Sequence, residues 1–241
     1  MTRRTGGQIL VDQLLAQGIE RLSCVPGESY LAVLDALHDA KIDVLVCRNE
    51  GGAAMMAEAY GKLTGRPGIC FVTRGPGATN ASHGVHIAAQ DSTPMILFIG
   101  QVERGMRERE AFQEVDYKAF FGSIAKWVVE VDSARRLPEL MARAFRIACQ
   151  GRPGPVVMAL PEDMLTETAD VADAPKVVPA EAWPGPQEME RFSELLRGAR
   201  APLFILGGSR WSEAAQKSLI AFSEKFAVPV TTSNAIHSPH G

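Results

Sequence analysis

Apolar positions in this chain alternate between two spacings, one typical of helices and one typical of short buried strands. Ile9, Leu10 and Leu14 recur at helical intervals, whereas residues 21–25 form a short run that stops at Pro26-Gly27. The alternation continues for about 160 residues. It predicts helices from residue 8 and over 30–40, 51–64, 80–89 and 138–150, and strands over 21–25, 43–47, 69–73, 95–99, 127–131 and 156–160.

Strands that alternate with helices indicate an α/β fold with a buried parallel sheet, flanked by helices and joined by right-handed crossovers. We expect one such domain over residues 1–165. Residues 166–186 are rich in Ala, Pro, Glu and Asp without apolar periodicity, which is typical of an interdomain linker.

A second α/β unit is expected over residues 187–241. Its predicted elements are a helix over 186–196, a strand over 203–206, a turn at Gly207-Gly208, a helix over 212–226 and a strand over 228–232. A unit of this size buries too little surface to be stable alone. We therefore expect the chain to be the front part of a longer protein, with an incomplete central domain.

The overall composition narrows the class of protein. The 241 residues are 46% hydrophobic and 22% charged, with a formal net charge of -3 and no basic stripe, so a nucleic-acid partner is not expected. The longest apolar run, residues 95–99, is too short to cross a membrane. The four cysteines form no C-x-x-C pair, which favours a reducing, cytoplasmic location.

Glu50 stands in the sequence Arg48-Asn49-Glu50-Gly51-Gly52, between a short apolar strand and a helix of small residues. An acid at this place has a purely structural interpretation, because a carboxylate in the first helical turn gains about 0.3–1 kcal/mol from the helix dipole. It also has a catalytic interpretation if a ligand lies against it.

A second motif, Gly75-Pro76-Gly77-Ala78-Thr79-Asn80, follows a predicted strand and opens a helix, which is the setting of a phosphate-binding turn. It lacks the third glycine of the dinucleotide fingerprint, so a nicotinamide site is a poor match. The structural alternative is a tight strand-to-helix turn with Asn80 as the helix cap.

These motifs resemble the pyrimidine-binding domain of the thiamine diphosphate enzymes related to acetolactate synthase, pyruvate oxidase and benzoylformate decarboxylase, closest to acetolactate synthase large subunits. The resemblance runs from about residue 4 to about 165, and residues 50–68 are similar to the family motif around its catalytic glutamate. It implies that Glu50 is the acid that hydrogen-bonds the aminopyrimidine of thiamine diphosphate. An apolar pocket would suit this role, because desolvation raises the pKa of a carboxyl group.

The resemblance also implies further site residues. Glu28 directly follows Pro26-Gly27, where related decarboxylases place an acid near the substrate, although a helix N-terminal acid is an equal alternative. Phe112 and Gln113 match a stretch that faces the cofactor and the substrate channel. Decarboxylases tend to have His-His there, so Phe-Gln favours carbon–carbon ligation over plain decarboxylation. The residues expected on the cofactor side are Pro26, Gly27, Glu50, Thr73, Gly77, Asn80 and Gln113.

Three other features of the sequence have ordinary structural interpretations. His83 and His86 share a helix face, but no third ligand lies nearby in sequence, so we expect no metal there. Met55 and Met56 indicate ordinary helix packing or a subunit interface. The charges of residues 103–110 alternate in sign and predict a solvated loop.

In this family a separate C-terminal domain holds the diphosphate and its Mg²⁺ through a Gly-Asp-Gly motif, and this chain contains no Asp-Gly pair. The family also builds each site across two subunits. We therefore expect a homodimer or homotetramer and inactivity of the chain alone, with FAD as a further candidate cofactor of the intact protein.

The sequence thus predicts the N-terminal part of an enzyme that decarboxylates a 2-oxo acid such as pyruvate and passes the enamine to an acceptor carbonyl, as acetolactate synthase does. The alternatives within the superfamily are a decarboxylase, a lyase or pyruvate oxidase. An alternative of another class is a non-catalytic α/β binding module in which Glu50 is only a helix-start acid.

Overall fold

The computed structural model describes residues 3–208 and 211–233. The chain divides into two compact units, Met1–Pro179 and Ala180–Gly241. The last residues of the predicted second domain, 234–241, lie outside the described residues.

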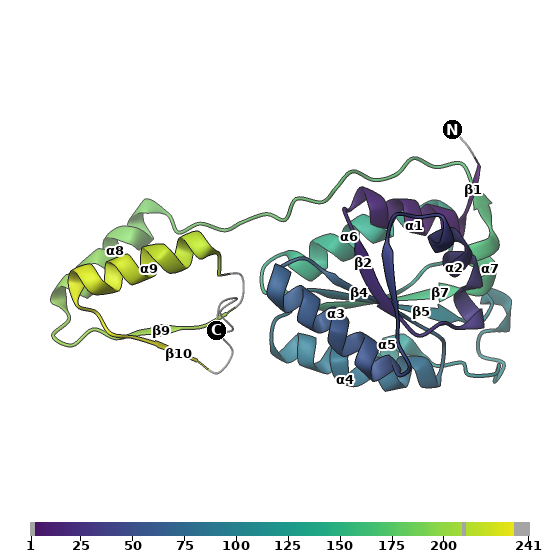
Figure 1. Ribbon diagram of the computed structural model, residues 1–241, viewed down its shortest axis with the longest axis horizontal. Coiled ribbons are helices and arrows are strands. Elements are labelled where there is room, and N and C mark those ends of the chain that lie inside the picture. Colours follow the sequence, from purple (N-terminus) through teal and green to yellow (C-terminus); the bar gives the residue numbers. More distant parts are fainter. Residues whose placement is uncertain (1–2, 209–210, 234–241) are drawn as a thin grey trace. The chain divides into compact units, whose positions relative to one another are not determined.

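The first unit is built on a six-stranded sheet whose neighbouring strands are all parallel. The strand order is β3-β2-β4-β5-β7-β6 (Figure 1). The strands are β2 (Arg21–Cys24), β3 (Asp43–Val46), β4 (Gly68–Val72), β5 (Met95–Gln101), β6 (Trp127–Glu130) and β7 (Pro155–Pro161). The predicted parallel α/β fold is confirmed.

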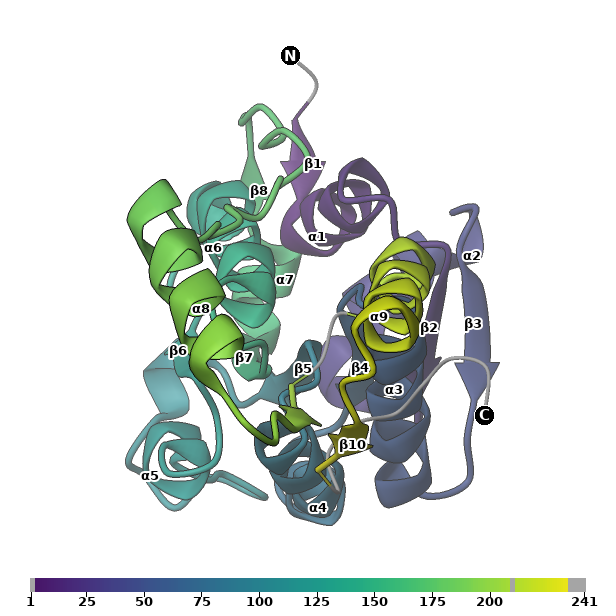
Figure 2. The same cartoon turned by 90° about the vertical axis from the view of Figure 1, so that its left-hand side faces the viewer.

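Helices cover both faces of this sheet. One face packs against α1, α2 and α6, and the opposite face packs against α3, α4 and α5. Figures 1 and 2 show α1 beside α6 and α3 beside α4. The helices are α1 (Gly6–Ala16), α2 (Leu31–His38), α3 (Glu50–Thr64), α4 (Pro76–Gln90), α5 (Tyr117–Phe121), α6 (Leu137–Cys149) and α7 (Glu162–Thr166).

The continuous apolar runs of the central strands follow from this two-sided cover. Along β4, Ile69 and Phe71 enter the core under α1, α2 and α6, whereas Cys70 and Val72 enter the core under α3, α4 and α5. Successive side chains of a strand point to opposite faces, so both sets must be apolar when both faces are covered. Phe71 stacks on Phe98 of β5, with ring centroids 4.5 Å apart.

The sheet grows in opposite directions from β2 and β4. The strand that follows β2 in the chain, β3, lies on one side of this pair, and the strand that follows β4, β5, lies on the other side. From β2 the chain crosses to β3 through α2 on one face, and from β4 it crosses to β5 through α4 on the other face. Parallel crossovers of one handedness require this change of face. In open α/β sheets, ligands bind beyond the carboxyl ends of the strands at such a switch point.

Some elements differ from the sequence prediction. Helix α4 begins at Pro76 rather than at residue 80, because proline is well suited to a first helical turn. Short 3₁₀ turns were also not predicted: η1 (Glu28–Tyr30), η2 (Arg104–Met106) and η3 (Ala134–Arg136). Nor was the small antiparallel pair of β1 (Arg4–Thr5) with β8 (Thr168–Ala169).

Part of the segment predicted as a linker lies against α1. The buried side chain of Gln13 donates to the Ala174 carbonyl and accepts from the Ala174 N–H, both at 2.9 Å. Gln17 donates to the Pro175 carbonyl at 3.0 Å and accepts from the Val177 N–H at 2.9 Å. The side-chain amides of Gln13 and Gln17 therefore hydrogen-bond the backbone of this stretch in the way that a neighbouring strand would.

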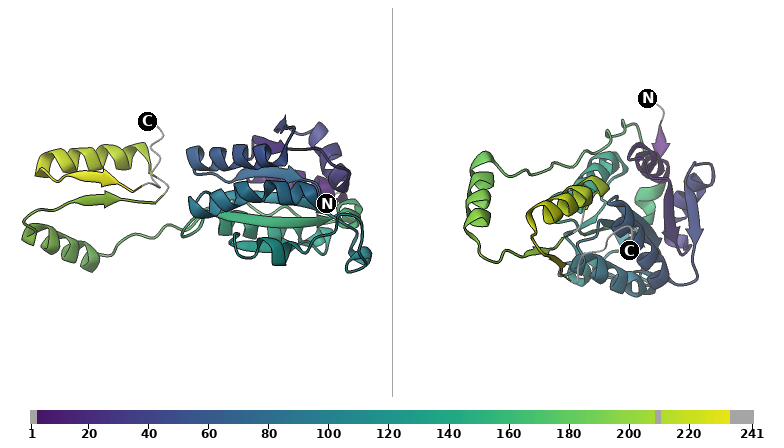
Figure 3. Two further views of the ribbon diagram at one scale, coloured as in Figure 1. Left: turned by 90° about the horizontal axis from the view of Figure 1, so that it is seen from below. Right: turned by 60° about the vertical axis from the view of Figure 1, so that its left-hand side comes forward.

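The second unit consists of α8 (Pro186–Gly198), β9 (Phe204–Leu206), α9 (Glu213–Phe226) and β10 (Val230–Thr232) (Figure 3). The two strands pair in parallel. Phe204 of β9 contacts Phe192 of α8 and Phe222 of α9, with ring centroids 6.1 and 5.6 Å apart. Neither helix contains a buried residue.

Among the described residues, no helix has both the length and the apolar character that a membrane span requires.

Candidate functional site

The candidate residues lie where the strands end. Pro26, Gly27 and Glu28 follow β2, Glu50 follows β3, and residues 73–80 follow β4. Because the strands are parallel, all of these segments emerge at one edge of the sheet, around the switch point between β2 and β4. The loop with Phe112 and Gln113 follows β5 and reaches the same edge.

Glu50 is the first residue of α3 and is half-buried. The preceding Asn49 caps the helix, and its side chain accepts a hydrogen bond from the Gly52 N–H at 3.2 Å. Asn80 of α4 donates from its Nδ2 to Glu50 Oε2 at 3.1 Å. The Asn80 amide thus fixes the carboxylate from the neighbouring helix.

Gly77 packs closely against Thr73 beside this carboxylate. A Cβ built on Gly77 would lie 2.8 Å from Thr73 Cγ2 and 3.6 Å from Glu50 Oε1. Glycine therefore lets the backbone of α4 come close to Thr73 and to the acid. The cap of α4 is Gly75, and Asn80 lies inside the helix, so the interpretation of Asn80 as a helix cap is wrong.

Thr73 connects the ends of β4 and β2. Its Oγ1 lies 2.8 Å from Ser29 Oγ, within hydrogen-bond distance. A Cβ built on Gly27 would lie 2.5 Å from Thr73 Cβ, so the two segments approach more closely than any larger residue would allow. Ser29 in turn packs against Gly100 of β5, where an added Cβ would lie 2.0 Å from Ser29 Oγ.

Gly75 is covered by the loop that follows β5. Its backbone has φ 59° and ψ -115°, a conformation that favours glycine. A Cβ built there would lie 2.7 Å from Gln113 Cβ, and Gln113 itself has φ 63°. The Gly75 N–H donates to the Tyr117 hydroxyl at 3.0 Å. Burial raises the pKa of Tyr117 to about 12, so the phenol is neutral at ordinary pH.

Arg74 was not singled out from the sequence, yet it is buried at this edge and bonds to three separate segments. It is 8% exposed. Its guanidinium lies 3.3 Å from Glu28 and 3.3 Å from Glu162, and its Nε donates to the Phe112 carbonyl at 3.2 Å. The Phe112 ring itself is 73% exposed. No spacing pattern predicts that an arginine is buried. The available signal in the sequence was the position of Arg74 directly before the Gly75–Asn80 motif.

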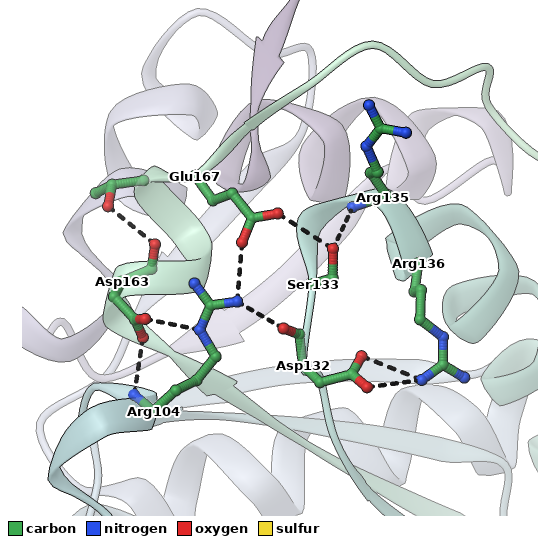
Figure 4. A network of polar contacts seen from close by, with 8 residues as sticks. Arg104, Asp132, Ser133, Arg135, Arg136, Asp163 and Glu167 are labelled. Atoms are coloured by element: carbon green, nitrogen blue, oxygen red, sulfur yellow. Dashed lines mark hydrogen bonds and ion pairs between the residues drawn. The ribbon is translucent and has the colours of Figure 1, made fainter.

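The charged loop over residues 103–110 is exposed as predicted, apart from half-buried Arg107, but two of its arginines also pair with carboxylates. Arg104 donates from its N–H and Nε to Asp163 at 3.0 and 2.7 Å, and from Nη1 to Glu167 at 2.9 Å (Figure 4). Arg107 pairs with Glu114 at 2.8 Å and also with Glu130. These pairs fold the loop back onto the domain.

Asp163 gives the domain a pH-dependent contact. Partial burial raises its pKa, but hydrogen bonds from the Arg104 amide and guanidinium outweigh this and lower the pKa below the usual range. The folded state therefore gains stability above the ordinary pKa of aspartate, near 3.9, and loses it as the pH falls through the lower folded value. We expect the urea midpoint to fall less between pH 7 and pH 3 in Asp163→Asn than in the wild type.

The control for that measurement is Asp43→Asn, because Asp43 forms an exposed pair with Arg21 at 2.7 Å, and exposed pairs contribute little. The Asp43→Asn protein should follow the wild-type pH dependence. Equal pH dependence in Asp163→Asn and in the wild type would contradict the assigned role of Asp163.

The histidines of α4 and the paired methionines of α3 lie at the surface. His83 Nδ1 lies 3.1 Å from the Asn80 carbonyl, and the imidazole is exposed. Within residues 3–208 and 211–233, no three His, Cys, Asp or Glu side chains gather as a metal site would require. Met55 and Met56 are 37% and 45% exposed on α3, which does not fit ordinary core packing.

A family comparison bears directly on this edge of the sheet. Residues 4–120 match the family described as "Thiamine pyrophosphate enzyme, N-terminal TPP binding domain". The matched segment contains Glu50, the Gly75–Asn80 turn and the Phe112–Gln113 loop. Residues 4–120 of the chain belong to this family.

Acetolactate synthases are similar over most of the chain. It is 37% identical to the acetolactate synthase isozyme 2 large subunit of Escherichia coli over 94% of its own length. It is 33% identical to the acetolactate synthase large subunit of Corynebacterium glutamicum and 31% identical to the acetolactate synthase of Bacillus subtilis, over 95% in each case. The chain spans 41%, 38% and 40% of these relatives, or about two fifths. The chain thus contains an acetolactate synthase-like N-terminal domain of the thiamine pyrophosphate enzyme family.

The predicted residues fall into two groups in the structure. Glu50, Thr73, Gly77, Asn80 and Gly27 form one connected cluster through the contacts described above. Gln113 joins it through Gly75, and Glu28 joins it through Arg74. Pro26 and the Phe112 ring are exposed beside this cluster.

Proposed function

We propose that this edge of the sheet is the pyrimidine-side half of a thiamine diphosphate site, in a longer enzyme that decarboxylates a 2-oxo acid such as pyruvate and joins the product to an acceptor carbonyl. The observation that carries the proposal is the Glu50 carboxylate, held by Asn80 at 3.1 Å beside the Gly77 backbone, where an added Cβ would lie 3.6 Å from Glu50 Oε1. A flat ring needs such a glycine-lined approach, and a carboxyl group suits a ring nitrogen as hydrogen-bond partner.

The residues of this chain would each have a defined task. Glu50 would hold a proton at the pyrimidine nitrogen, and Asn80 would orient its carboxylate. Thr73, Gly77 and Gly27, with Pro26 beside them, would form the floor on which the ring lies. Gln113, Phe112 and Glu28 would face the substrate. When bound, thiamine diphosphate supplies the carbanion stabilisation that cleaving and forming bonds next to a carbonyl requires.

Ligation is favoured over plain decarboxylation by the loop after β5. Phe112 and Gln113 occupy the substrate side, and neither carries an imidazole that would transfer a proton near neutral pH. Product analysis with pyruvate alone and with a second oxo acid separates a ligase from a decarboxylase, lyase or oxidase.

The diphosphate, its Mg²⁺ and any FAD belong to parts other than this site. Mg²⁺ prefers near-octahedral oxygen ligands. As the family resemblance implies, the proposal assigns Mg²⁺ to a C-terminal domain. A flavin would need the remainder of the central domain, of which residues 187–241 would be the beginning, after a pyrimidine-binding domain over 1–165 and a linker over 166–186.

The assembly proposed for the intact enzyme is a homodimer or homotetramer in the cytoplasm. Exposed Met55, Met56 and Phe112 support a covered surface in the complete protein. Cys24, Cys47, Cys70 and Cys149 form no disulfide bond, which supports a reducing compartment.

Isothermal titration of the 241-residue chain with thiamine diphosphate tests the half-site directly. We expect weak or undetectable binding that Mg²⁺ does not strengthen, and the same result with thiamine, because this half lacks an anchor for the diphosphate. Tight binding that depends on Mg²⁺ would contradict the proposal and would mean that this chain holds a complete site.

A further inference from the structure

Arg74 differs from the other charged residues of the carboxyl edge because it is almost fully buried. It is 8% exposed, whereas the side chains of its two carboxylate partners, Glu28 and Glu162, are 73% and 39% exposed. A guanidinium stays charged at any ordinary pH, and burying it is costly unless it is paired and hydrogen-bonded. The position of the Arg74 guanidinium is therefore set by the groups that pair with it.

Those partners come from three separate loops. Glu28 follows β2, Phe112 lies in the loop after β5, and Glu162 begins α7 directly after β7. The contacts are 3.3 Å from Nη2 to Glu28, 3.3 Å from Nη1 to Glu162, and 3.2 Å from Nε to the Phe112 carbonyl. A guanidinium has donors that point in several fixed directions, so one side chain joins all three loops.

The Phe112 contact matters because of the residue that follows. Gln113 has φ 63°, and its Cβ lies against Gly75, the residue next to Arg74. Fixing the Phe112 carbonyl therefore fixes the unusual turn that presents Gln113. The Glu28 contact holds an otherwise exposed carboxylate at the switch point between β2 and β4.

We propose that Arg74 is a positioning residue, which places Glu28 and Gln113 together at the carboxyl edge of the sheet. For catalysis this rests on the proposed function, in which those two residues face the substrate. Arg74 acts through them and not on the reacting atoms. The third contact, to Glu162, ties both loops to the end of β7 and to the Asp163–Arg104 pair beside it.

Hydrogen–deuterium exchange of the 241-residue chain tests this without any activity. The loop amides to follow are Glu114, which bonds the Ala111 carbonyl at 3.0 Å, and Tyr30, which bonds the Gly27 carbonyl at 3.4 Å. Arg74→Met should speed exchange at both by about tenfold or more, because local opening becomes easier. Arg74→Lys keeps the positive charge but loses the fixed N–H donors of the guanidinium. Its exchange rates at both amides should lie between those of the wild type and of Arg74→Met.

The matched control is Arg21→Met, which removes an exposed arginine from the opposite edge of the same sheet. Its exchange at Glu114 and Tyr30 should equal that of the wild type. If Arg74→Met does not fold, Arg74→Lys decides the question. Wild-type exchange in whichever Arg74 variants fold would overturn the proposal.

Kinetics of the complete enzyme test the consequence for the reaction. Arg74→Met should lower kcat by about 10- to 100-fold through misplacement, with KM for pyruvate changed less than about threefold. When Arg74→Met is combined with Glu28→Gln, kcat should fall by less than the product of the two single-variant losses. The reason is that both changes act on the Glu28 carboxylate. Independent, multiplicative losses would overturn the positioning role. An inactive wild type would overturn the proposed function, and the exchange rates would still decide the role of Arg74.

Discussion

Replacing Glu50 with glutamine in the complete enzyme is expected to lower kcat for pyruvate about 100- to 10,000-fold, the usual contribution of a positioned acid or base. Glutamine has the same shape and still accepts a hydrogen bond from Asn80, which lies 3.1 Å away. It cannot exchange a proton with a ring nitrogen. The loss should therefore appear in the rate, and the fold should be retained.

Two measurements separate this result from a structural effect. The loss of a helix-start charge costs about 0.3–1 kcal/mol, so the unfolding midpoint should move little. Glu20→Gln is the control, because the Glu20 side chain is 81% exposed at the opposite edge of the sheet, and its activity should equal that of the wild type. A Glu50→Gln enzyme with near wild-type kcat would favour the non-catalytic α/β module.

Replacing Gly75 with alanine should destabilise the first unit by about 2–4 kcal/mol, from backbone strain and overpacking together. The added Cβ would lie 2.7 Å from Gln113 Cβ and 2.9 Å from the Gln113 carbonyl oxygen. Relief of this clash requires the loop after β5 to move. We therefore expect both a lower urea midpoint and a lower kcat in the complete enzyme.

The control for this change is Gly105→Ala, a glycine at the same edge of the sheet. A Cβ built on Gly105 has nothing within 4 Å, and this residue is not among the glycines with positive φ. Its unfolding midpoint should stay within about 0.5 kcal/mol of the wild type, as is usual for such surface changes. Equal midpoints for the Gly75 and Gly105 variants would show that the turn tolerates a side chain.

The main elements of the fold were predictable because each obeys a local rule. The strand predicted at 43–47 is β3 (Asp43–Val46), and the helix predicted at 51–64 is α3 (Glu50–Thr64). Periodicity shows which residues share a face, and burial on both faces of a sheet forces continuous apolar runs. The start of α4 was misplaced because Pro76 was assigned to the turn, although proline is favoured at the start of a helix.

The candidate site was predictable in part. The motifs around Glu50 and around Gly75–Asn80 are local and distinctive, so the sequence alone pointed to both. Arg74 was missed because its importance depends on Glu28, Phe112 and Glu162, which lie 46, 38 and 88 residues away in the chain. The ion pairs of the loop after β5 were not predicted for the same reason, since the partners of Arg104 come from α7 and the residue after it.

The sequence by itself determined the alternation of strands and helices, the family resemblance and the acid at Glu50, because these depend on residues close together in the chain. Only the tertiary structure decided which strand ends meet, that Asn80 holds Glu50 from inside a helix, and that a buried arginine ties three loops together. Strand order and ion-pair partners arise from contacts across tens of residues, and local propensity carries no information about such contacts.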